Sequence, residues 1–153
     1  MIESTNRIER QILLKAPRSR VWRALTEPHE FGAWFGVKLT GPSMAPGQHL
    51  SGNVTYSGYE HVLLEIWIEK VEPERRLWWS WHPAAIEPGV DYSAEPKTLV
   101  EFELTEVQGG TLFKVVESGF DGIPLARRAK VFGMNTRGWE AQMVNIEKHV
   151  DQA

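Results

Sequence analysis

The stretch LARRAKVFGMNTRGWEAQMVNIEKHV, residues 125–150, carries the apolar stripe of one long amphipathic helix. Its apolar side chains recur at every third or fourth position, which matches the turn of an α-helix, and Thr136 is the one polar member. Pro124 suits the first helical turn. A helix with one apolar stripe needs an apolar surface to cover, so the rest of the chain is expected to supply one. The members of the stripe are Leu125, Ala129, Phe132, Thr136, Trp139, Met143, Ile146 and Val150.

The region before this helix, residues 37–120, has the two-residue alternation of β-strands. EPERR at 72–76 and QGG at 108–110 have the composition of turns, so each is expected to join two antiparallel strands in a hairpin. The strands expected around these turns are VLLEIWIEKV (62–71), LWWSWH (77–82), TLVEFELTEV (98–107) and TLFKVVESGF (111–120).

The N-terminal region predicts a strand followed by two short helices. RIERQILLKA at 7–16 reads as the strand, APRSRVWRALTEP at 16–28 as the first helix, and HEFGAWFG at 29–36 as the second. The expected fold is therefore α+β, a single domain over residues 1–153. A curved antiparallel sheet of about seven strands wraps around the long C-terminal helix, and a cavity is expected between them.

Composition excludes several classes of function. The chain of 153 residues has a net charge of −3 and no basic cluster, so a nucleic-acid partner is not expected. It has no cysteine, and its five histidines show no metal-ligand spacing, so neither a metal nor a cofactor is expected. No apolar run is long enough to cross a bilayer and the N-terminus does not resemble a signal peptide, which predicts a cytoplasmic protein without membrane insertion.

Four sequence stretches in this order resemble the START-like, or SRPBCC, superfamily, which has the helix-grip fold of the birch pollen allergen. They are APRSRVWRALTEP, VEPERRLWWSWHP, GGTLFKVVESGF and GWEAQMVNIEKHV. Within the superfamily, the chain is most similar to the family related to the activator of the heat-shock chaperone ATPase. The resemblance implies binding of a small hydrophobic or aromatic ligand. It leaves two alternatives open, a cyclase or lyase type of enzyme and a co-regulator of a chaperone ATPase.

Three tryptophans within RLWWSWHP, residues 76–83, raise the question of whether they pack the core or line a pocket. Strand alternation places Trp79 and Trp81 on the inner face, opposite the helix. Two large rings on one strand are hard to pack without a gap, and binding pockets are lined by aromatic side chains. The residues expected to line the cavity are Trp34, Phe35, Trp79, Trp81, Phe120, Trp139 and Met143.

Polar residues near this cavity are candidates for ligand contact. The alternation of the last strand points Glu117 inward, where a carboxylate needs a partner. Arg128 is the expected partner, as one of three polar residues that recur every seven positions beside the apolar stripe, with Asn135 and Gln142. A tyrosine or histidine near the cavity mouth is the alternative partner. A structural ion pair and an acid–base role for Glu117 in an enzyme both remain open. In the strand at 62–71, alternation places His61 opposite Val62 and so turns it away from the cavity.

Two further features complete the expectations. The proline-rich connection at 83–97 is expected to form a stiff flap whose Asp91 and Tyr92 contact a ligand or stay in solvent. On the outer face of the sheet, three large apolar side chains predict a homodimer, unless charged neighbours shield them. These side chains are Leu63, Trp67 and Trp78.

Overall fold

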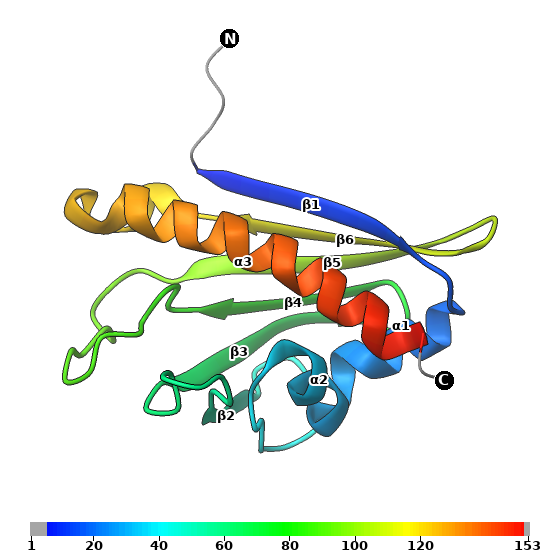
Figure 1. Ribbon diagram of the computed structural model, residues 1–153, viewed down its shortest axis with the longest axis horizontal. Coiled ribbons are helices and arrows are strands. Elements are labelled where there is room, and N and C mark those ends of the chain that lie inside the picture. Colours follow the sequence, from blue (N-terminus) through cyan, green and yellow to red (C-terminus); the bar gives the residue numbers. More distant parts are fainter. Residues whose placement is uncertain (1–5, 152–153) are drawn as a thin grey trace, which may run out of the picture.

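The computed structural model describes residues 6–151, which form one antiparallel sheet with a long helix across one of its faces (Figure 1). The order of strands in the sheet is β1-β6-β5-β4-β3-β2. Every neighbouring pair is antiparallel, so hairpins and one crossover build the whole sheet. The strands are β1 (Arg7–Leu14), β2 (His49–Asn53), β3 (Leu63–Glu72), β4 (Arg76–Trp81), β5 (Thr98–Val107) and β6 (Gly110–Ser118).

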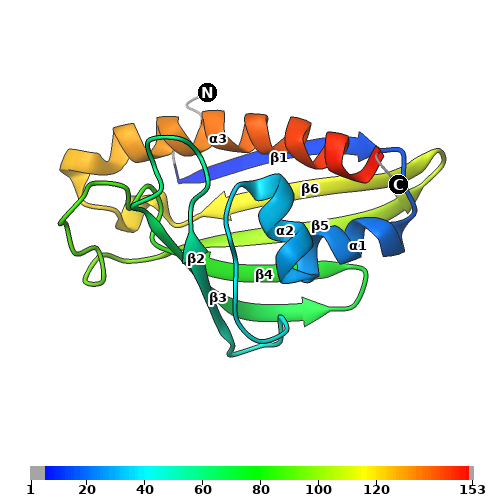
Figure 2. The same ribbon diagram turned by 60° about the horizontal axis from the view of Figure 1, so that its bottom comes forward.

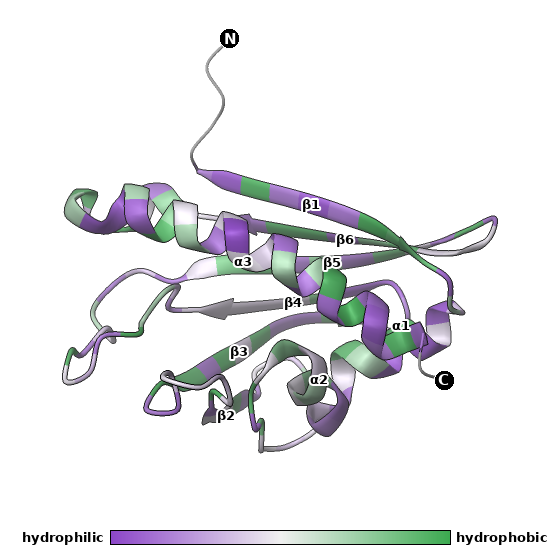
Figure 3. Cartoon of the chain, viewed as in Figure 1, coloured by the Kyte–Doolittle hydropathy of each residue, from purple (hydrophilic) through white to green (hydrophobic). Residues whose placement is uncertain are grey.

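The helices all lie on the same side of the sheet (Figure 2). α1 (Arg18–Thr26) and α2 (Pro28–Phe35) follow β1, and the short helix η1 (Phe120–Gly122) precedes α3 (Leu125–Asp151). α3 is continuous over 27 residues, and Figure 3 shows hydrophilic and hydrophobic bands alternating along it, as the apolar stripe predicts. Within residues 6–151, none of the helices combines the length and the apolar character needed to span a membrane.

The sheet has six strands rather than the expected seven or so. Residues 37–40 run beside β2 but form only two isolated bridges, Val37 with Val54 and Thr40 with Ser51. Gly41, with a φ of 140°, ends this extended segment, and two prolines follow at positions 42 and 46. Proline lacks a backbone N–H, so the segment cannot continue the ladder of hydrogen bonds.

The inner face of the sheet supplies the core. On β3 and β4 the side chains of Ile66, Ile68, Leu77 and Trp79 are buried against the helices, as their alternation predicts. A register shift between Ile68 and Lys70 places an extra residue in β3. Val71 therefore pairs with Leu77 on the inner face after the shift.

On the outer face, lysine side chains cover two of the three apolar residues that predict a dimer. The Lys97 ammonium lies 4.1 Å from the ring centre of Trp67, and the Lys70 ammonium lies 4.6 Å from that of Trp78. Such cation–π contacts shield apolar surface, so part of the expected patch is already covered. Leu63 is 52% exposed. The homodimer through this face stays a prediction.

A charged cluster joins the three main helices at the C-terminal end of α3. Glu30 of α2 accepts hydrogen bonds from Arg20 and Arg23 of α1, at 2.7 and 2.8 Å, and lies 3.0 Å from His149 of α3. Burial alone would raise the pKa of Glu30, but the hydrogen bonds from His149, Arg20 and Arg23 outweigh it and lower the pKa to about 2. The carboxylate thus holds α1 and α2 against α3.

We expect Glu30→Gln to lower the free energy of unfolding at neutral pH by about 2 kcal/mol. The pKa of Glu30 is lower in the folded state than its ordinary value of 4.5, so its contribution is complete above pH 4.5 and is lost as the pH falls towards 2. Urea unfolding across this range should show the difference between wild type and variant shrinking. Glu140→Gln, at an exposed carboxylate, is the matched control; a difference that stays constant with pH would contradict the prediction.

Candidate functional site

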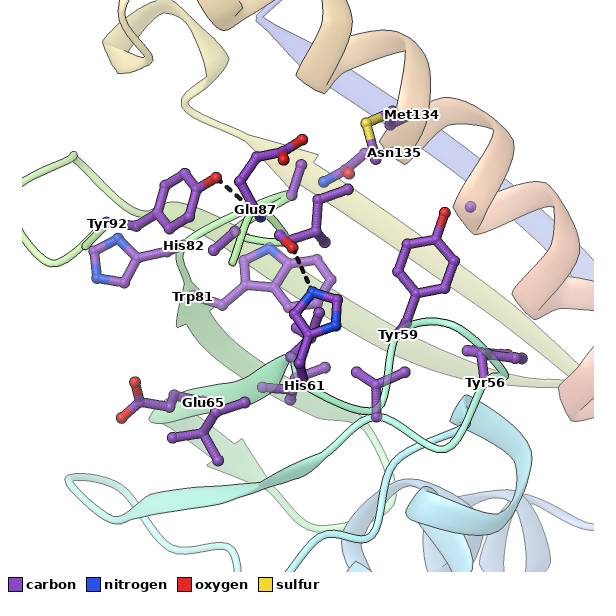
Figure 4. A pocket seen from close by; sticks show the side chains of 18 of the residues that line it. Tyr56, Tyr59, His61, Glu65, Trp81, His82, Glu87, Tyr92, Met134 and Asn135 are labelled. Carbon is purple, nitrogen blue, oxygen red and sulfur yellow. Dashed lines mark hydrogen bonds between the residues drawn. The ribbon is translucent and has the colours of Figure 1, made fainter. Parts of the chain in front are cut away.

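A cavity of about 1150 Å³ lies between α3, the ends of β3 and β4, and two loops, residues 54–62 and 82–97 (Figure 4). Its inner wall is aromatic, and its outer wall is formed mainly by the loops. The cavity is open to solvent, as shown by several apolar lining residues that are about half exposed. These exposed lining residues are Tyr56, Tyr59, Leu63 and Val90. Leu63 and Trp67, which strand alternation places on the outer face of the sheet, thus also line the cavity.

Three rings from three different elements form the inner wall. Phe35 comes from the end of α2, Trp81 from the end of β4 and Trp139 from the middle of α3. Their ring centres are 6.0 to 6.1 Å apart in all three pairs, so each ring touches the other two. Trp81 is the least buried of the three, and Figure 4 shows its indole spread across the back of the cavity.

A fully buried carboxylate holds two of these rings in place. Glu117 of β6 accepts hydrogen bonds from the indole N–H groups of Trp81 and Trp139, both at 2.8 Å. Thr98 donates a third hydrogen bond at 2.5 Å, and the side-chain amide of Asn135 donates to both carboxylate oxygens at 2.9 and 3.1 Å. Glu117 does not itself line the cavity. It therefore acts on the cavity through the two indoles and Asn135.

The helix side of the cavity is formed by one face of α3 that contains a glycine. Met134, Asn135, Gly138 and Gln142 all line the cavity beside Trp139. A side chain on Gly138 would meet no other atom within 4 Å, so this position opens onto free space. The glycine makes the cavity deeper there, at a helix cost of about 1 kcal/mol relative to alanine.

The loop from 82 to 97 is fastened to α3 by Arg127. The guanidinium group donates to both carboxylate oxygens of Glu95, at 3.0 and 3.1 Å, and to the carbonyl oxygen of Pro83 at 3.4 Å. It also lies 4.8 Å from the ring centre of Tyr92, whose hydroxyl accepts a hydrogen bond from the backbone of Glu87. Both ends and the middle of the loop are thereby held, so it forms a defined wall.

The second loop, residues 54–62, contributes Tyr56, Tyr59 and His61. Tyr56 lies against Gly36, which ends α2 with a φ of 92°, and its hydroxyl donates to the carbonyl oxygen of Phe35. The Nε2 atom of His61 lies 2.9 Å from the carbonyl oxygen of Ile86, and this contact bridges the two loops across the cavity (Figure 4).

The structure separates the residues that were expected to line the cavity. Phe35, Trp81 and Trp139 do so, whereas the other four are buried in the core. Trp79 lies only two residues before Trp81, but it is enclosed by other rings, among them Phe31 and Phe102. The four core residues are Trp34, Trp79, Phe120 and Met143.

Glu117 faces inward as expected, but the prediction that Arg128 is its partner is wrong. Arg128 instead donates to the carbonyl oxygens of Ile123 and Asp121 at the start of α3. The partner on α3 is Asn135, which lies one heptad further along the helix and close to the end of β6. The recurrence of polar residues every seven positions therefore indicated the correct helix face, and only the level along the helix was misjudged.

The expected orientation of His61 is also wrong, because residues 60 and 61 form a turn and β3 begins only at Leu63. Strand alternation therefore does not apply to His61, which lines the cavity. Tyr92 of the proline-rich connection lines it too, as does Asp91. Sequence reasoning missed the roles of Arg127, Tyr56 and Thr98. Arg127 and Tyr56 belong to no periodic apolar pattern, and Thr98 lies on the alternating strand β5 without a motif that marks it.

An antiparallel sheet that grips a long C-terminal helix, with a cavity between them, defines a START-like protein of the helix-grip fold. The model of the family described as activator of Hsp90 ATPase homolog 1-like protein matches residues 15–151, and the chain belongs to this family. No curated protein is significantly similar in sequence.

Several solved structures share the fold. MLL2253 from Mesorhizobium loti has a TM-score of 0.75 and 24% sequence identity, and the match covers 96% of this chain and 98% of that one. CalU16 from Micromonospora echinospora has a TM-score of 0.62 and 24% identity, with coverage of 94% and 74%. DynU16, a protein of the dynemicin biosynthetic locus, has a TM-score of 0.72 and 22% identity, with coverage of 95% and 47%. At these identities the similarity shows the fold alone.

We expect Glu117→Ala to lower the free energy of unfolding by roughly 3 kcal/mol or more, because it leaves several buried donors without an acceptor. Urea denaturation measures this change. Glu106→Ala, at an exposed position of β5, is the control and should stay within about 0.5 kcal/mol of wild type. Equal effects of the two substitutions would show that the Glu117 network does not support the fold.

Gly138→Ala is expected to stabilise the protein by about 1 kcal/mol, since alanine favours the helix and meets no neighbour here. Gly133→Ala is the matched comparison: its new side chain would lie 3.5 Å from Arg137, an ordinary contact, and Gly133 does not line the cavity. Thermal unfolding should show a similar gain for both. A loss at position 138 alone would mean that the cavity is smaller than described.

Proposed function

We propose that the protein binds a small hydrophobic or aromatic molecule in the cavity between the sheet and α3. The observation that carries this proposal is the pair of indoles, Trp81 and Trp139, fixed by a shared buried carboxylate on the wall of a cavity of about 1150 Å³. Cavities of this size, with aromatic walls and a few polar groups, are typical of small-molecule sites. The family and the fold support the same class of function.

Two features of the cavity favour binding without a large rearrangement. Arg127 holds the loop 82–97 against α3, and the contact between His61 and Ile86 joins that loop to the loop 54–62. A ligand that enters a preformed site loses less binding free energy to the ordering of the protein. The half-exposed tyrosines at the opening, Tyr56 and Tyr59, offer further aromatic surface to such a ligand.

The position of Glu117 favours a binding protein over an enzyme that uses this carboxylate for acid–base chemistry. A general acid or base must come within hydrogen-bond reach of the ligand atom that gains or loses the proton. Glu117 is fully buried, does not line the cavity, and already accepts hydrogen bonds from four side chains. Its role in this proposal is to position Trp81, Trp139 and Asn135.

Titration with Nile red, an uncharged dye whose emission depends on polarity, tests the proposal. Binding should raise the emission of the dye and quench tryptophan fluorescence. Gly138→Leu fills the cavity from α3 and should weaken binding roughly tenfold or more, as a loss of about 1.4 kcal/mol would. Gly133→Leu introduces the same side chain on the same helix outside the cavity and should bind as wild type does.

Trp81→Ala supplies an independent check, because it removes the most accessible ring of the inner wall. Its affinity for the dye should fall, while a variant at the outer face, Trp78→Ala, should keep the affinity of wild type. If Gly138→Leu and Trp81→Ala both bind the dye as tightly as wild type, the dye binds elsewhere and the proposed site is wrong.

A further inference from the structure

The negative charge of Glu117 has no cation beside it. All of its hydrogen-bond partners are neutral donors, and among residues 6–151 no lysine, arginine or histidine nitrogen lies within 4.0 Å of the carboxylate. Arg128 is engaged by carbonyl oxygens at the start of α3. Hydrogen bonds stabilise the carboxylate but do not cancel its charge, so its field extends into the neighbouring cavity.

The two indoles transmit this charge to the wall of the cavity. Each N–H group points at the carboxylate, and a hydrogen bond of this kind draws electron density onto the donor ring. The face of an indole is already its negative side, and it attracts cations. Trp81 and Trp139 therefore present rings whose attraction for a cation is strengthened by Glu117, at 2.8 Å from each indole nitrogen.

Most of the charged side chains around the cavity have the same sign of charge as Glu117. Three carboxylates line it, from Glu65, Glu87 and Asp91, against one lysine, Lys97. Lys97 lies over the outward-facing ring of Trp67, while the next residue, Thr98, points inward and donates to Glu117. Neighbouring residues on an extended strand point to opposite faces, so the lysine is turned away from the buried carboxylate.

We infer that the cavity takes an organic cation: an aromatic or aliphatic molecule that carries a protonated amine, in preference to one that carries a carboxylate. The inference rests on the proposed binding function and specifies the charge of the ligand. The apolar part of the ligand lies against Phe35, Trp81 and Trp139. Its ammonium group lies against an indole face or beside the carboxylates of Glu87 and Asp91, from the loop 82–97.

Three naphthalene probes of similar size test this inference by isothermal titration calorimetry at neutral pH. They are 2-naphthylmethylamine, which is a cation, 2-naphthylmethanol, which is neutral, and 2-naphthoate, which is an anion. We expect the amine to bind roughly tenfold or more tighter than the naphthoate, with the alcohol between them. Added salt should weaken the binding of the amine and leave the affinity of the alcohol unchanged, because salt screens only the charged probe.

The double variant Glu87→Gln/Asp91→Asn identifies the source of the preference. Both carboxylates are exposed, so their removal should leave the fold intact, and the ratio of amine to naphthoate affinity should fall about threefold or more. The control Glu9→Gln/Glu106→Gln removes the same charge from positions outside the cavity and should leave the ratio unchanged. An equal fall in both variants would assign the preference to net charge and overturn the inference.

The outcomes distinguish this inference from the proposed binding function on which it rests. If the alcohol binds in the cavity and the naphthoate binds as tightly as the amine or tighter, the binding function stands and the preference for a cation is wrong. If none of the three probes binds, and Nile red also fails, the proposed binding function is wrong and the inference fails with it. Binding of Nile red with none of the three probes contradicts the inference alone.

Discussion

Hydrogen bonds to the buried carboxylate of Glu117 hold three strands of the sheet and the long helix together. Its partners come from the end of β4, the start of β5 and the middle of α3, so one side chain of β6 connects the sheet to the helix that covers it. An isolated carboxylate in an apolar interior would be too costly, and these neutral donors make its burial possible. The packing of α3 on the sheet and the inner wall of the cavity therefore depend on the same carboxylate.

The two inward tryptophans of β4 differ in burial because the helices cover different parts of the strand. Trp79 is opposite α2, where Phe31 and Phe35 cover it, and it is fully buried. Trp81 lies one step further along the same face, where the rings of Phe35, Trp79 and Trp139 contact it and it also lines the cavity. The same alternation thus gives one core residue and one residue of a cavity wall.

Much of the fold could be predicted from the sequence because its elements are periodic. Alternation identified the inner faces of β3, β4 and β6, including the inward direction of Glu117, and the apolar stripe identified α3. The cavity was harder to predict because most of its outer wall comes from loops, which have no period. The partner of Glu117 was missed for a different reason: heptad spacing gives the face of a helix but not its height above the sheet.

The fastening of the loop 82–97 by Arg127 also has a consequence for the unbound protein. A free loop of this length samples many backbone conformations, and holding one of them costs conformational entropy. Here that cost is met during folding, by contacts of Arg127 with Glu95, Pro83 and Tyr92. Under the proposed function, a ligand would therefore meet a wall whose shape the folded chain has already fixed, and its fit to that shape would decide how tightly it binds.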